Sequence, residues 1–108
     1  MALVELRFSE RNRERILTRN KFVTTRRTAH GVPGDHFVLD GRRFEFRLVS
    51  QMRLGHVAEF YYPLEGCASP QEFLEEWVRN YDLVRPPNLF DLVFLHEFSE
   101  VVTPPPPG

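Results

Sequence analysis

The chain has 108 residues, of which 42% are apolar and 27% charged, and its formal net charge is −1 at pH 7; these values fit one globular domain and exclude a disordered chain. The one cysteine, Cys67, cannot form an internal disulfide, which excludes a secreted disulfide scaffold. No apolar run approaches the roughly 18 residues of a membrane span, and residues 1–8 do not resemble a signal peptide, so we expect a cytoplasmic protein without a membrane partner.

The first 27 residues predict a strand, a helix and a second strand. Residues 3–8 alternate and are expected to form the first strand. Ser9 is a suitable N-cap for a short helix over residues 10–18. Residues 21–27 are rich in β-branched side chains and predict the second strand.

The middle of the chain predicts a loop followed by three strands. Glycine and proline in residues 28–35 favour a loop. Strands are expected at residues 36–39, 42–52 and 56–62. Asp40-Gly41 between the first two is a strong hairpin signal. In the strand that follows, Phe44, Phe46 and Leu48 are expected to share the buried face.

The last third predicts a helix and a closing strand. Ser69, Pro70 and Glu72 stand where an N-cap, a first helical residue and a capping-box acid belong. Apolar residues then recur at helical spacing up to Tyr81. Residues 90–98 predict the closing strand, and the proline-rich residues 102–108 are expected to be a disordered tail.

These elements together predict one α+β domain over residues 1–101. Strand, helix, four strands, helix and strand favour a small mixed β-barrel of about six strands flanked by two main helices. No internal repeat marks a second domain.

Charge is divided unevenly along the chain. Residues 1–54 hold twelve Lys and Arg against six Asp and Glu, whereas residues 55–108 hold two against nine. This division is compatible with a basic face that meets phosphate, or with two halves that interleave and neutralise each other.

Thirteen of the fourteen basic residues are arginine, which suggests a GC-rich or heat-adapted source. Lys21 is the single lysine, and a lysine acts as a base when its pKa is lowered, whereas arginine does not.

The stretch of residues 18–26 carries the clearest candidate chemistry. If Lys21 and Thr24 lay on one regular strand, their side chains would point to opposite faces. Lys21 must therefore lie in the turn before the strand, or at a bulge, for both groups to reach one site.

At this point the chain resembles the ASCH domain, a PUA-like fold associated with RNA metabolism. The resemblance rests on the order of several short motifs between about residues 3 and 99. These are Lys21-x-x-Thr24-x-Arg26 after a helix, Gly34-Asp35 before a strand, Glu65-Gly66 before the capped helix with Glu72 and Phe73, and His96-Glu97-Phe98 in the last strand.

The resemblance implies RNA or a modified nucleoside as partner. Small members of the family include amidohydrolases that remove the acetyl group from N4-acetylcytidine. Carried over, Thr24 would be the nucleophile, Lys21 its base and Glu65 the acid for the leaving group, with Glu72 as the other candidate acid. The residues expected to bind substrate or RNA are Arg26, Arg27, Asn20 and Glu72.

Two residues depart from the family pattern, and other functions stay open. Arg19 stands where the family often has glycine, and Phe22 where it often has threonine. The alternatives are a ribonuclease and a non-catalytic RNA-binding module. No Cys or His cluster has metal-ligand spacing, so we expect neither a metal nor a cofactor.

Overall fold

The computed structural model describes residues 1–102, which form three helices and four strands. In chain order they are α1 (Glu10–Leu17), β1 (Val23–Arg26), β2 (His36–Leu39), β3 (Arg42–Arg53), α2 (Leu54–Phe60), α3 (Pro70–Asn80) and β4 (Leu92–Val101). Apart from Val102, the tail expected at residues 102–108 lies outside the described residues.

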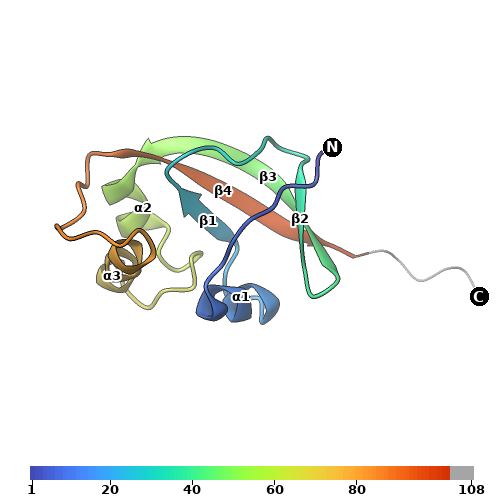
Figure 1. The fold of residues 1–108 in the computed structure, drawn as a ribbon, viewed down its shortest axis with the longest axis horizontal. Coiled ribbons are helices and arrows are strands. Elements are labelled where there is room, and N and C mark those ends of the chain that lie inside the picture. The colour runs from blue at the N-terminus through green and yellow to red at the C-terminus, as the bar shows by residue number, and fades with distance from the viewer. Residues whose placement is uncertain (103–108) are drawn as a thin grey trace, which may run out of the picture.

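The strands form a single curled antiparallel sheet in the order β1-β4-β3-β2 (Figure 1). β3 and β4 are the long central pair, with a register shift between Phe46 and Leu48. This bulge inverts the alternation of β3, so Phe44 and Phe46 are buried while Leu48 is 45% exposed. Sequence alternation alone had predicted all three side chains on one face.

The sheet has four antiparallel strands where a mixed barrel of about six was expected. The two expected main helices are α1 and α3, and α2 is a third. Residues 56–62 were expected to be a strand, but Leu54–Phe60 is helix α2. Its buried residues are Leu54, Val57 and Ala58, which follow helical and not alternating spacing. The N-terminal segment makes only an isolated bridge, Leu3 to His36, because it leaves β2 directly afterwards.

Local signals at the other helix ends and at the hairpin were correct. The Ser9 hydroxyl accepts a hydrogen bond from the Asn12 amide, and Ser69 accepts one from Glu72. Asp40 and Gly41 have φ values of 50° and 75°, as the left-handed turn of a tight hairpin requires.

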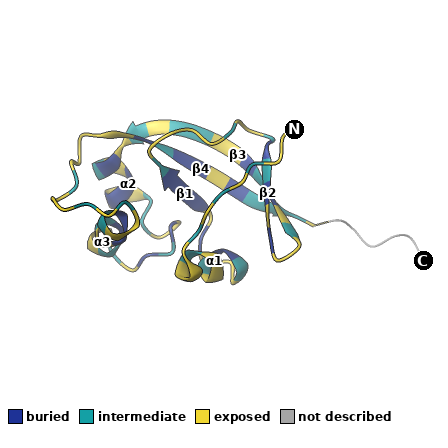
Figure 2. Cartoon of the chain, in the orientation of Figure 1, coloured by how far each residue is buried: buried dark blue, intermediate teal, exposed yellow. Residues whose placement is uncertain are grey.

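The curled sheet covers two apolar clusters, visible as the buried parts of the ribbon in Figure 2. One lies under α2 and α3 and includes Leu54, Trp77 and Leu95. The other lies beside α1 and includes Ile16 and Phe37. None of the three described helices has the length and hydropathy that crossing a bilayer requires.

The two oppositely charged halves of the sequence interleave in the fold. Basic residues of the first half pair with acidic residues of the second at Arg11–Glu72, Arg15–Glu72, Arg15–Glu76, Arg19–Glu100, Lys21–Glu65 and Arg42–Glu100. Five of the twelve basic residues in the first half are therefore paired with carboxylates of the second half.

Candidate functional site

Lys21 lies in the turn between α1 and β1. The helix ends at Leu17, the Lys21 amide donates to the Arg15 carbonyl at 3.1 Å, and β1 begins only at Val23. Arg19 has φ of 63°, a left-handed conformation that glycine adopts without strain. The turn frees Lys21 from the alternation of the strand, as the proposed shared site requires.

Glu65 reaches the same place from the loop after α2. One carboxylate oxygen contacts the Lys21 ammonium, and the other accepts a hydrogen bond from the Thr25 hydroxyl at 2.5 Å. The exposed fractions of the Lys21 and Glu65 side chains are 5% and 3%. One carboxylate thus joins a buried cation and a strand hydroxyl.

Gly66 lets the chain turn directly after Glu65. Its φ is +83°, and an added Cβ would lie 3.0 Å from the Asn20 carbonyl oxygen and 2.9 Å from Arg15 Cδ. This close approach sets the loop against the turn that carries Lys21.

Thr24 makes different contacts from its neighbour Thr25. Its hydroxyl accepts a hydrogen bond from Arg26 Nε at 3.2 Å. Its carbonyl oxygen lies 3.1 Å from Nδ1 of the fully buried His96. His96 Nε2 accepts from the His30 amide at 3.0 Å, so the ring is neutral with its proton on Nδ1. Burial lowers the pKa of His96, which keeps it neutral.

Arg26 is half-buried beside these groups. Its guanidinium lies 4.9 Å from the centre of the Phe8 ring, and Nη2 donates to the Arg7 carbonyl at 2.8 Å. Burial lowers the pKa of Arg26 from its ordinary value.

These side chains line one cavity of about 340 Å³. One wall carries the polar groups Lys21, Thr24, Thr25, Arg26 and Glu65. A second wall comes from α3 and the residue after it, and carries Phe73, Glu76, Trp77, Asn80 and Tyr81. Arg7, Phe8, Ser9, Asn12 and Cys67 complete the lining. A small polar centre facing aromatic side chains is the usual character of a small-ligand site.

Three of the residues expected in the site lie elsewhere. Asn20 is exposed, and its side-chain amide donates to Thr18. Arg27 stacks on the outer side of Tyr81, 4.3 Å from the ring centre, and lines a separate, more open depression. Glu72 pairs with Arg11 and Arg15 and does not line the cavity, so Glu65 and not Glu72 accompanies Lys21.

The sequence also failed to indicate some residues that line the cavity. Thr25 was grouped with Thr24 as one of two β-branched strand residues, and nothing in the sequence indicated that its hydroxyl binds Glu65. Trp77 was assigned to the core, and it is 7% exposed and packed there, yet it also lines the cavity. The helical spacing of Phe73, Trp77 and Tyr81 was the available signal, because it places all three on one face.

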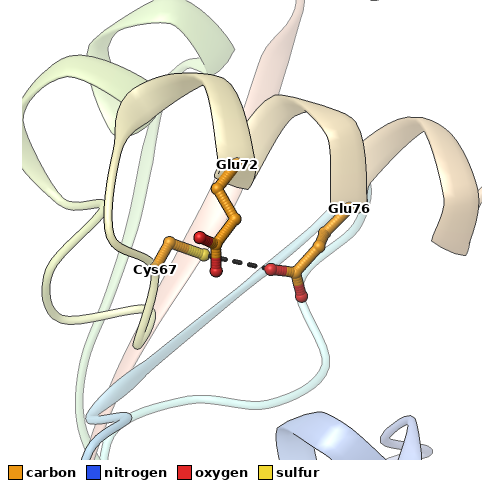
Figure 3. Close-up of side chains that lie close together, drawn as sticks. All are labelled: Cys67, Glu72 and Glu76. Carbon is orange, nitrogen blue, oxygen red and sulfur yellow. Dashed lines mark hydrogen bonds between the residues drawn. The ribbon is translucent and has the colours of Figure 1, made fainter.

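Cys67, Glu72 and Glu76 form the one group of potential metal ligands found among residues 1–102 (Figure 3). Arg15 binds both carboxylates, at 2.8 Å from Glu72 and 2.6 Å from Glu76. Burial, reinforced by Glu76, raises the pKa of the Cys67 thiol to about 12. The carboxylates are thus already neutralised, and the thiol is protonated at ordinary pH, so the cluster does not fit a metal ion.

No family model and no curated protein matches the sequence. Two solved structures resemble the fold. The crystal structure of an ASCH domain from Lactobacillus crispatus has a TM-score of 0.65 at 18% identity, over 92% of this chain and 78% of the other. The solution structure of a protein from Pyrococcus furiosus has a TM-score of 0.59 at 17% identity, over 93% of this chain and 96% of the other. The chain therefore has the fold of an ASCH domain.

Proposed function

We propose that this chain is a member of the ASCH family, and that its cavity binds RNA or a modified nucleoside and hydrolyses the acetyl amide of N4-acetylcytidine. The shared fold supports the family assignment. The observation that carries the proposal is the buried Lys21–Glu65 pair beside two threonine hydroxyls in one cavity. The free energy that both charges lose on leaving water is often larger than the attraction between them, so a buried ion pair adds little to stability. Its presence in a cavity therefore favours a functional role over a purely structural one.

The aromatic wall suits a nucleobase. Phe73, Trp77 and Tyr81 present ring surface to the cavity, and every base has a π-face that can stack on such rings.

The polar wall can supply both halves of an amide hydrolysis. Moving one proton from the Lys21 ammonium to Glu65 leaves an amine base and a carboxylic acid in contact. Thr24 Oγ then attacks the acetyl carbonyl while Lys21 takes its proton, and the C–N bond breaks as Glu65 protonates N4 of the leaving cytidine. The products of this step are cytidine and an acetyl ester on Thr24.

Water completes the cycle through the same groups. Glu65 takes a proton from the attacking water, and the Lys21 ammonium returns a proton to Thr24 Oγ as the ester breaks. Acetic acid leaves, and the amine and carboxylic acid are restored. Arg26 donates a hydrogen bond to Thr24 Oγ, so the proton of this hydroxyl is free to leave toward the base.

The experiment is incubation of the full chain with N4-acetylcytidine and detection of cytidine by chromatography. We expect release by the wild type and none by Lys21→Ala or Thr24→Ala. Thr28→Ala is the matched control, because Thr28 is exposed and does not line the cavity. If the folded wild-type protein released no cytidine, the proposed amidohydrolase activity would be wrong.

Two alternatives are separated by arms of the same experiment. A ribonuclease would shorten an RNA oligonucleotide and leave the acetylated nucleoside intact. A non-catalytic module would bind RNA with strong salt dependence and change neither substrate.

A further inference from the structure

Arg26 differs from the other half-buried arginines of this chain. Residues 1–102 contain three arginines of intermediate burial, namely Arg15, Arg26 and Arg42. Arg15 pairs with Glu72 and Glu76, and Arg42 binds both carboxylate oxygens of Glu100 at 2.9 and 2.7 Å. No carboxylate among the described residues lies within ion-pair distance of Arg26.

The neighbours of Arg26 hold its guanidinium without neutralising it. Its two hydrogen bonds go to uncharged oxygens, on Thr24 and on the backbone of Arg7. Glu65, on the same wall of the cavity, is engaged by Lys21 and Thr25. The pKa directions agree. Burial lowers the pKa of Arg26 by more than Tyr81 and Glu65 raise it, whereas carboxylate partners outweigh burial and raise the pKa of Arg15 and Arg42.

A second cation without a carboxylate partner lines the same cavity. Arg7 is exposed, and it has no ion pair among residues 1–102. Once Lys21–Glu65 and Arg15–Glu76 are paired, Arg7 and Arg26 are the remaining charged residues of the lining, and both are cations. The Arg26 guanidinium is held in place by stacking and hydrogen bonds, so it is pre-organised for an oxyanion such as a phosphate.

We propose that the ligand of this cavity carries a phosphate group, which binds to Arg26 with help from Arg7. The identity of the rest of the ligand as a nucleoside rests on the proposed function. The preferred ligand is then a nucleotide, as a free monophosphate or as a residue of RNA, and a neutral nucleoside is a weaker ligand of the same cavity.

The test measures binding to the full chain by calorimetry at low salt, with cytidine, cytidine 5′-monophosphate, cytidylyl-cytidine and inorganic phosphate as ligands. We expect the monophosphate to bind at least roughly thirtyfold more tightly than cytidine. This is the affinity that a complex typically loses when one member of a desolvated charge pair is missing. The preference should shrink as salt rises. A dinucleotide that binds more tightly than the monophosphate would identify RNA as the source of the phosphate.

Arg26→Met should remove the preference for the monophosphate over cytidine, whatever its effect on the affinity for cytidine itself. Arg43→Met is the matched control, because it removes one exposed guanidinium outside the cavity and should change nothing. Arg26→Lys keeps the charge but not the planar fork, and should retain part of the preference. The salt dependence of the wild type tests the proposal without any substitution.

The outcomes separate this proposal from the proposed function. Equal affinity for cytidine and its monophosphate overturns the phosphate site and leaves the nucleoside site standing. Binding of inorganic phosphate that depends on Arg26, without binding of any nucleoside, supports the anion site and overturns the nucleoside assignment. A phosphate preference that survives in folded Arg26→Met overturns the role of Arg26.

Discussion

Lys21 and Glu65 are 44 positions apart in the chain, and their side chains form an ion pair that is almost wholly buried. The turn after α1 supplies the cation, and the loop after α2 supplies the anion. Neither residue would be stable in that environment alone, because an isolated buried charge loses its hydration without compensation. The pair therefore links the stability of the fold to the chemistry of the cavity.

Removing one member of this pair should cost more stability than removing both. We expect Lys21→Met and Glu65→Met each to lower the free energy of unfolding by about 3–5 kcal/mol, because each leaves an unpaired buried charge. The double variant should be no less stable than either single variant. Urea unfolding gives the free energy of unfolding of all three variants. If the loss in the double variant equalled the sum of the two single losses, Lys21 and Glu65 would not be coupled.

The two adjacent threonines should have separable roles in hydrolysis of N4-acetylcytidine. We expect Thr24→Ala to lower kcat by more than about a thousandfold and Thr24→Ser to retain activity, since serine keeps a nucleophilic hydroxyl. Thr25→Val should lower kcat less, because it removes only the hydrogen bond that holds Glu65. Steady-state kinetics measures these differences, and a larger loss in Thr25→Val than in Thr24→Ala would exchange the two assignments.

His96 should make the fold less stable in mild acid. Its pKa in the folded protein is lowered from the ordinary 6.5 by burial, so between the lowered value and about 6.5 the unfolded chain binds more protons. The contribution of His96 is complete above about pH 6.5 and is lost as pH falls through that interval, with a slope of at most about 1.4 kcal/mol per pH unit.

Urea unfolding at about pH 7.5 and about pH 5.5 measures the effect. His96→Gln should reduce the difference in stability between the two conditions, since glutamine can both donate and accept without titrating in this range. His56→Gln, which replaces an exposed histidine, is the control for loss of an imidazole outside the buried site. An unchanged difference in His96→Gln would place the pH dependence in other groups.

The Cys67 thiol should be inert in the folded protein. Its pKa is raised to about 12, and its side chain is buried against Glu76 at 3.4 Å. We expect iodoacetamide to label it far more slowly in the native protein than in urea, because the thiolate is the reactive form. Mass spectrometry follows the labelling, and equal rates in the two conditions would show that the thiol is accessible.

Gly66 should tolerate a side chain less well than Gly41. Both have positive φ, at 83° and 75°, so alanine at either position carries a backbone strain of about 1–2 kcal/mol. At Gly66 the new Cβ would also meet the Asn20 carbonyl and Arg15, whereas at Gly41 nothing lies within 4 Å. We expect Gly66→Ala to lose about 1–3 kcal/mol more than Gly41→Ala in urea unfolding. Equal losses would mean that the loop moves without cost.

Only part of the candidate site could be predicted from the sequence. The requirement that Lys21 leave the strand before Thr24 followed from alternation alone, and the structure places Lys21 in that turn. Glu65 and Glu72 could not be distinguished, because both stand near the start of one helix. In the fold, Glu72 pairs with Arg11 and Arg15, so it does not accompany Lys21. No local sequence pattern predicts these two ion pairs.

The sequence by itself determined the elements whose signals are local. Ser9, Ser69 and Asp40-Gly41 act on backbone groups within a few residues, so their hydrogen bonds and turn angles are independent of the rest of the fold. The tertiary structure alone decided that residues 54–60 form a helix, that β3 has a bulge, and that Glu65 meets Lys21. These features depend on which faces are buried and which charges lose water, and both are set by segments distant in the chain.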